Sequence, residues 1–189
     1  MQLVKPAFEY LSSYVEALRR GWSPDTLRAE RAVEELEEIE RDAETFLASL
    51  EDLEAKGAPV KQLDGSTRPR LPGFRRWMWD GEFCGSIGFR WQPGTTDLPE
   101  HVLGHVGYAV VPWKRGRGYA TRALQLLLPE IAAFGLDHIQ VTTDEDNFAS
   151  QRILEKCGAV LIERFTRSWA HDGKEILRYQ IDLPKVASA

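Results

Sequence analysis

The sequence has little cysteine, no long hydrophobic run and no basic excess, and each lack excludes a class of protein. No apolar run approaches the ~20 residues that cross a bilayer, and the first residues lack the basic-then-apolar layout of a signal peptide. The two cysteines, Cys84 and Cys157, lie far apart without metal-ligand spacing. We therefore expect a cytoplasmic protein with reduced thiols, no metal and no membrane partner. The net charge of −5 argues against nucleic acid as a partner.

The order of the segments predicts a single α+β domain over residues 1–189, a length that can bury a sizeable core. One strand and two or more helices come first, then antiparallel strands, a strand–helix–strand–helix unit and two final strands. This order predicts a mixed sheet, mostly antiparallel, with one parallel pair in the middle. The expected strands are Gln2–Val4, Phe74–Trp79, Phe83–Trp91, Val106–Val111, His138–Thr143, Val160–Thr166 and Glu175–Leu183.

The stretch from Leu27 to Glu54 is rich in Glu and is predicted to be helical. The residues Ser23-Pro24-Asp25 before it resemble a helix cap, and Asp42 is expected to start a second helix over Ala43–Ala55. The acidic side chains have two interpretations: a solvated helix face, which is the commoner case, or a surface that attracts a cationic substrate.

The stretch that organises the chain is residues 104–121. An apolar run, Val106–Val111, has the composition of a buried strand, and Pro112 ends its pairing. The basic, glycine-containing segment Lys114–Gly118 follows, and the helical pattern Tyr119–Glu130 comes directly after it. A strand, a loop and a helix start in this order predict an anion site, because the first-turn N–H groups have no helical acceptor and the helix dipole favours negative charge there.

The loop sequence matches one known kind of phosphate-binding loop better than the others. A Walker loop ends in Gly-Lys-Ser/Thr, whereas this one reads Gly118–Ala120, and a dinucleotide loop needs a small residue where Thr121 stands. The segment Arg115–Ala120 fits the pattern Arg/Gln-x-x-Gly-x-Gly/Ala. With its Val-Val-Pro before and its apolar helix after, it resembles the GNAT superfamily of acyl-CoA-dependent N-acyltransferases.

A second segment, TTDEDNFASQRILEKCG at residues 142–158, resembles the later strand and helix of the same superfamily. The resemblance covers residues 74–165 well and the first seventy poorly. It implies a GNAT-like sheet with a splayed parallel strand pair and flanking helices. It also implies that residues 74–189 bind acetyl-CoA and that residues 1–73 form the acceptor side. The acceptor would be a small-molecule amine or a peptide, and the exposed final strands could mediate a homodimer.

The resemblance assigns the acetyl-CoA contacts residue by residue. The pyrophosphate would lie on the loop, where Lys114 adds a nearby charge, and the pantetheine arm would pair with the main chain of the splayed strand as an added strand does. The implied cofactor-binding residues are Ala109, Val110, Val111, Arg115, Gly116, Arg117, Gly118, Tyr119, Ala120 and Asn147.

For catalysis, the resemblance implies direct attack of a primary amine on the thioester, with a base and a proton for the departing thiolate. Many members supply that proton from a Tyr where this sequence has Leu154, so we expect Ser150 to replace it, although a helix-surface hydroxyl fits equally well. His105 is the first candidate base, with His101 and Glu100 as alternates, while a lone strand His is more often structural.

Tyr108 lies on the same side of its strand as Val110, where it could line the thioester slot or simply pack. The interpretation we favour is an N-acetyltransferase. A non-catalytic acyl-CoA-binding module is the first alternative, because the usual Tyr is missing. A nucleotide-binding regulatory domain is the second, and both loop comparisons disfavour it.

Overall fold

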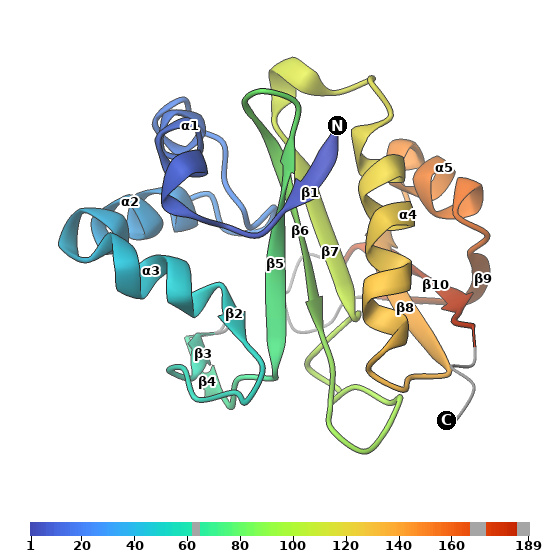
Figure 1. The fold of residues 1–189 in the computed structure, drawn as a ribbon. Coiled ribbons are helices and arrows are strands. Elements are labelled where there is room, and N and C mark those ends of the chain that lie inside the picture. Colours follow the sequence, from blue (N-terminus) through green and yellow to red (C-terminus); the bar gives the residue numbers. More distant parts are fainter. Residues whose placement is uncertain (62–64, 167–172, 185–189) are drawn as a thin grey trace.

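The fold consists of two β-sheets with helices on both faces of the first (Figure 1). The computed structural model describes residues 1–61, 65–166 and 173–184, and the loop expected between the last two strands lies largely outside these ranges. The helices are α1 (Phe8–Arg19), α2 (Arg31–Arg41), α3 (Ala43–Ser49), the short 3₁₀ helix η1 (Pro112–Lys114), α4 (Tyr119–Ala132) and α5 (Phe148–Lys156). In the described part of the chain, none of them is long and apolar enough to cross a membrane.

The first sheet is antiparallel and has the order β1-β5-β6-β7, with β2 on the same edge of β5 as β1. Its strands are β1 (Gln2–Val4), β2 (Glu51–Asp52), β5 (Gly73–Trp79), β6 (Phe83–Arg90) and β7 (Val106–Val110). A small separate hairpin joins β3 (Val60–Lys61) to β4 (Thr67–Arg68).

Both faces of this sheet are buried. The consecutive residues Trp77 and Met78 are both inaccessible to solvent. Since consecutive side chains of a strand point to opposite faces, each of the two faces is buried at this point. Trp77 belongs to the apolar core formed with α1 and α3, and Met78 belongs to the core formed with α4. Figure 1 shows α1–α3 on one side of the strands and α4 and α5 on the other.

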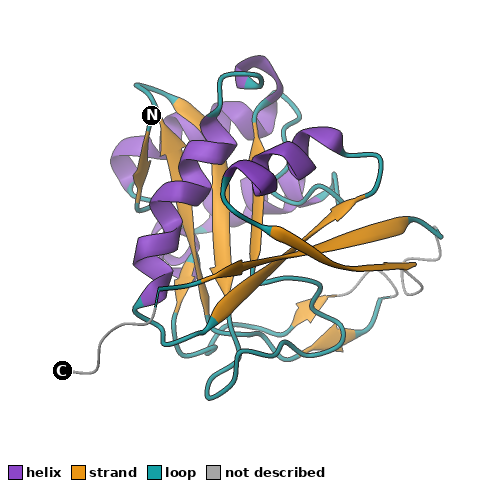
Figure 2. Ribbon diagram, turned by 90° about the vertical axis from the view of Figure 1, so that its right-hand side faces the viewer, coloured by secondary structure: helices purple, strands orange, loops and turns teal. Residues whose placement is uncertain are grey.

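The second sheet has the order β8-β10-β9 and crosses the first obliquely (Figure 2). Its strands are β8 (His138–Asp144), β9 (Val160–Thr166) and β10 (Glu175–Asp182). The two sheets are joined just before β7, where the N–H of His105 donates to the carbonyl of Gln140 at 2.7 Å. Within the described ranges, no further ladder pairing joins β7 to β8. The predicted α+β fold is thus confirmed. The strands β7 and β8, expected to be a splayed parallel pair, belong instead to two different sheets.

Two helix boundaries differ from the sequence-based expectation. The second helix begins at Arg31 rather than near Leu27, because Ser23 Oγ accepts from the Asp25 N–H and donates to the Arg28 carbonyl, which holds a turn there. The third helix ends at Ser49, since the next residues pair with β5 as β2. The expected cap at its start is confirmed: Asp42 Oδ1 accepts from the Thr45 N–H at 3.0 Å.

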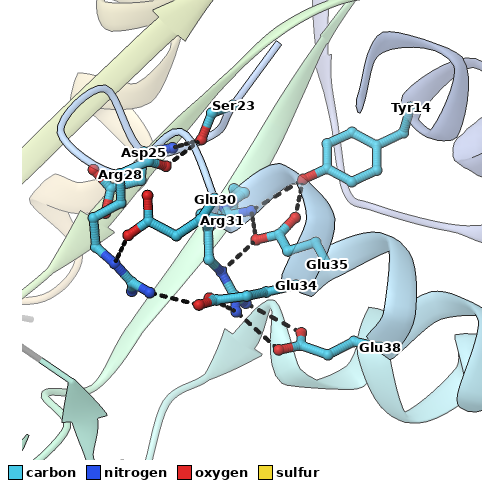
Figure 3. Close-up of polar contacts among 10 residues, drawn as sticks. Tyr14, Ser23, Asp25, Arg28, Glu30, Arg31, Glu34, Glu35 and Glu38 are labelled. Atoms are coloured by element: carbon cyan, nitrogen blue, oxygen red, sulfur yellow. Dashed lines mark hydrogen bonds and ion pairs between the residues drawn. The ribbon is translucent and has the colours of Figure 1, made fainter. Parts of the chain in front are cut away.

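A buried carboxylate fixes α2 to the first sheet (Figure 3). The side chain of Glu35 has 0% exposure and accepts hydrogen bonds from the Tyr14 hydroxyl, from Arg31 Nε at 3.2 Å and from an Arg75 guanidinium nitrogen at 3.1 Å. Two further acidic residues of α2 are also paired: Glu34 with Arg28 at 2.7 Å and Glu38 with Arg31 at 2.8 Å. These pairs account for part of the acidic surface by interactions within the protein.

Replacing Glu35 by Ala should lower the free energy of unfolding by about 3 kcal/mol, because it leaves two guanidinium groups and a buried hydroxyl without their shared acceptor. The matched control is Glu38→Ala, which removes a half-exposed carboxylate and should cost about 1 kcal/mol or less. Urea unfolding measures both. Equal losses for the two variants would contradict a special role for the buried carboxylate.

Candidate functional site

The loop Arg115–Gly118 connects η1 to α4 and is exposed along its whole length. Gly116 and Gly118 have φ angles of +76° and +75°, a left-handed conformation that glycine adopts without steric cost. Gly118 is the N-cap of α4, and no side chain caps this helix start. The first-turn N–H groups of a 14-residue helix therefore face an open, glycine-lined space, which suits an anion.

The positive charges near this loop are not equivalent. Arg115 and Arg117 are exposed beside the helix start. Lys114 is only 4% exposed, and its Nζ lies 2.6 Å from Asp80 Oδ1 and 2.7 Å from Glu82 Oε1. Two carboxylates thus already match its charge. The expectation that Lys114 neutralises a bound phosphate does not fit this geometry.

The main chain of β7 offers hydrogen-bonding groups toward the gap between the sheets at one of the three expected positions. The N–H of Val111 donates to the Cys84 carbonyl at 2.9 Å, and its carbonyl accepts from the Lys114 N–H at 3.0 Å. The carbonyl of Ala109 faces β6, because a Cβ built on Gly85 would lie only 2.3 Å from it. Since main-chain groups alternate along a strand, those of Val110 face the gap.

The Val110 carbonyl already has a partner in the loop. Arg115 Nε donates to it at 3.3 Å. The loop and the free edge of β7 are therefore in direct contact. The structure thus brings the expected anion-binding loop and the gap-facing main chain of Val110 together.

The start of α5 lies across the same gap from β7. Asn147 is the N-cap of α5, and its Oδ1 accepts from the Ser150 N–H at 3.1 Å. The buried Ser150 Oγ lies 2.8 Å from the Tyr108 hydroxyl, so the two side chains bridge β7 and α5. Burial raises the pKa of Tyr108 to about 12, which keeps its hydroxyl protonated near neutral pH. Leu154 is fully buried in the core, as suits an apolar residue on this helix.

Tyr108 is the residue of this site to which the sequence assigned no definite role. Its strand position put it on the side of Val110, but nothing in the sequence placed a helix residue 42 positions later opposite it. The alternation of the strand predicted the side on which Tyr108 lies, and the Asn-x-x-Ser helix start predicted the position of Ser150. Only the packing of α5 against β7 combines them.

His105 occupies the junction of the two sheets and has no exposure to solvent. Its Nδ1 accepts from the Gln140 N–H at 3.0 Å, so the neutral ring carries its proton on Nε2. That nitrogen is buried without a hydrogen-bond partner in the described residues. Burial lowers the pKa of His105 to about 4. This geometry favours a structural role, and the two alternate bases lie in the turn before β7, with Glu100 exposed and His101 half-buried.

Comparison with known proteins places the chain in a family. A model described as an acetyltransferase (GNAT) domain matches residues 22–160, which include the loop, β7 and α5. The chain belongs to the GNAT acetyltransferase family. The match also includes residues 22–73, where the sequence motifs resembled the family least. No curated protein sequence matches this chain.

Solved acetyltransferase structures share the fold over nearly the whole chain at low sequence identity. The microcin C7 self-immunity acetyltransferase MccE, crystallised with acetyl-CoA and AMP, is 13% identical with a TM-score of 0.62, over 96% of this chain and 91% of that one. The ribosomal L7/L12 α-N-protein acetyltransferase RimL, in complex with coenzyme A, is 11% identical with a TM-score of 0.58, over 96% and 93%. Salmonella typhimurium yncA, crystallised with its cofactor acetyl-CoA, is 13% identical with a TM-score of 0.56, over 99% and 96%.

The lowered pKa of His105 makes the stability of this GNAT protein depend on pH. The unfolded chain takes up a proton near pH 6.5 and the folded chain only near pH 4, so stability is lost as pH falls between these values. Between pH 7 and pH 5 the wild type should lose about 2 kcal/mol more than His105→Asn, whose Oδ1 can still accept from Gln140. Urea unfolding at both pH values measures this. Parallel losses would show that the ring is not held neutral by burial.

Proposed function

We propose that this GNAT protein is an N-acetyltransferase that moves an acetyl group from acetyl-CoA to a primary amine. The observation that carries the proposal is the exposed, uncapped start of α4 beside the unpaired edge of β7. A diphosphate suits the helix start, and an arm containing amides suits a free strand edge. The acetyl-CoA bound to MccE and yncA and the coenzyme A bound to RimL support this donor.

The loop residues Arg115–Ala120 would bind the pyrophosphate through main-chain N–H groups and the exposed guanidinium groups of Arg115 and Arg117. The pantetheine arm would pair with the N–H and carbonyl of Val110, and the amide of Asn147 would contact the arm from α5. In this arrangement Arg115 exchanges the Val110 carbonyl for the diphosphate. Ala109 and Val111 would then shape the strand edge rather than bond the arm.

The chemical step needs two proton transfers. An alkylamine has a pKa near ~10, so it must lose a proton before its nitrogen attacks the thioester carbon. The N–H of Val110 would stabilise the negative charge that develops on the carbonyl oxygen. As the carbon–sulfur bond breaks, Ser150 would donate its hydroxyl proton to the thiolate and take a proton from the Tyr108 hydroxyl through their shared hydrogen bond. The proton that the amine nitrogen loses would return to Tyr108 through solvent. His105 stays a prediction as the base, and its occupied Nδ1 favours a chain of water molecules instead.

The acceptor would be the amine of a small molecule or of a peptide N-terminus. Residues 1–73, with α1–α3 on one side of the first sheet, would form the acceptor side, and residues 74–189 the donor side. The name of RimL, a ribosomal L7/L12 α-N-protein acetyltransferase, supports the peptide class. The two free cysteines fit the expected cytoplasmic location.

Gly118→Asp should weaken acetyl-CoA binding by about 100-fold or more, because it places a carboxylate where the diphosphate would lie. The matched control is Gly118→Asn, which has nearly the same shape and tolerates the left-handed backbone equally well but carries no charge. It should cost about tenfold at most. Isothermal titration calorimetry measures both affinities. Wild-type affinity in the Asp variant would show that the diphosphate lies elsewhere.

Ser150→Ala should lower kcat by about 100-fold and leave KM for acetyl-CoA within about twofold, because the lost proton donor acts only in the transition state. Tyr108→Phe should lower kcat about tenfold, and the double variant should be no slower than Ser150→Ala. Thiol release is measured with an amine found by screening aminoglycosides, polyamines, amino acids and peptide N-termini.

The same screen tests the alternative function. Leu154 fills the position where many GNAT enzymes have a Tyr acid, and this single feature favours a non-catalytic acyl-CoA-binding module. Tight acetyl-CoA binding without thiol release for any amine class would establish that alternative. A wild-type kcat in Ser150→Ala would instead remove Ser150 from the mechanism and leave the transferase intact.

A further inference from the structure

Asp80 lies at the turn of the β5–β6 hairpin, outside the loop and the strand edge of the proposed donor site. Its N–H donates to the Glu82 carbonyl at 3.3 Å, which closes the turn. Its Oδ1 accepts from Lys114 Nζ at 2.6 Å, and its Oδ2 accepts from the Tyr119 hydroxyl at 2.5 Å. Lys114 immediately precedes and Tyr119 immediately follows the exposed loop Arg115–Gly118. One carboxylate therefore joins both ends of the loop.

The Lys114 end of this connection is firmly held. Its main-chain N–H donates to the Val111 carbonyl at 3.0 Å, so the residue is fixed to the end of β7. Although burial opposes its charge, hydrogen bonds to Asp80 and Glu82 raise the pKa of Lys114 above its ordinary value. Burial likewise opposes the charge of Asp80, yet the hydrogen bonds from Lys114 and Tyr119 hold the pKa of Asp80 below its usual range. The carboxylate and the ammonium are both charged near neutral pH.

The charge of Asp80 is unfavourable for the function of the neighbouring loop. A carboxylate close to a bound diphosphate repels it, and with Glu82 it cancels the one buried lysine of the region. If charge were its only effect, removing Asp80 would strengthen anion binding. If Asp80 instead holds the loop in place, removing it would weaken anion binding. The loop N–H groups would then have to be ordered when the ligand binds, which costs free energy.

We infer that Asp80 is a positioning residue of the donor site, which holds the two ends of Arg115–Gly118 so that the loop N–H groups converge on one diphosphate. The inference rests on the proposed function, since it assumes that acyl-CoA binds at this loop. It assigns to the β5–β6 hairpin a part in donor affinity that neither the loop motif nor the comparisons indicate. The Tyr119 hydroxyl acts here through Asp80 rather than on the ligand.

The test compares donors that contain and lack the diphosphate. Asp80→Ala should weaken binding of acetyl-CoA, and of adenosine 3′-phosphate 5′-diphosphate, about tenfold in calorimetry. The KM for S-acetylpantetheine, which has the arm but no diphosphate, should stay within about twofold of the wild type. The matched control is Glu82→Gln, which removes one charge from the same Lys114 without touching Tyr119. It should leave acetyl-CoA affinity unchanged or slightly higher.

A second variant keeps the buried ion pair and so protects the test against a folding defect. Tyr119→Phe removes only the link from Asp80 to the start of α4 and should weaken acetyl-CoA to a similar extent. Both changes break the same connection. The double variant Asp80→Ala/Tyr119→Phe should therefore bind acetyl-CoA no more weakly than whichever single variant has the lower affinity. Additive losses would show that the Tyr119 hydroxyl contacts the ligand independently, which would overturn the inference.

Three further outcomes are decisive. Unchanged or tighter acetyl-CoA binding by Asp80→Ala overturns the positioning role, because charge is then the only effect. Equal losses for acetyl-CoA and S-acetylpantetheine also overturn it, because they indicate a general structural role. If the wild type itself does not bind acetyl-CoA, the proposed function is wrong and the inference with it. If the wild type binds acetyl-CoA but Asp80→Ala gives one of the first two results, the inference is wrong and the proposed function stands.

Discussion

The structure depends on the junction between the two sheets. At His105 the chain is bonded to Gln140 through both its main-chain N–H and its side-chain Nδ1, and from this point β7 and β8 separate. A parallel pair that continued would use the main-chain groups of Val110 within the protein. Because it does not continue, this edge of β7 has no ladder partner among the described residues. The buried imidazole of His105 lies where this pairing stops, directly before β7.

The proposed donor site is assembled from parts of very different rigidity. The edge of β7 is fixed by β6, and Ser150 and Tyr108 are fixed by the packing of α5, whereas the loop Arg115–Gly118 is exposed and contains two glycines in the left-handed conformation. Backbone freedom of this kind is costly to order when a ligand binds. The contacts of Asp80 at both ends of the loop, which come from the hairpin turn of β5 and β6, would reduce that cost.

Much of the fold and the outline of the site could be predicted from the sequence. The glycine pattern of Arg115–Ala120, the alternation along β7 and the Asn-x-x-Ser helix start are local signals, and each is observed where it was expected. The pairing of Tyr108 with Ser150 and the burial of Lys114 depend on contacts between segments 30 or more residues apart. Local patterns do not encode such contacts, and a lysine beside a phosphate loop looks the same in sequence whether it faces the ligand or the core. The expected start of α2 near Leu27 was wrong for another reason. The Ser23 side chain holds a turn there, which competes with the helix.

Gly85 affects the proposed donor site although it lies on the neighbouring strand β6. This residue lies on β6 with a φ of +149°, and a methyl group there would come within 2.3 Å of the Ala109 carbonyl. Any larger residue would therefore push β7 away from β6. The spacing of β7 from β6, and with it the position of Val110, thus depends on the absence of a side chain at Gly85.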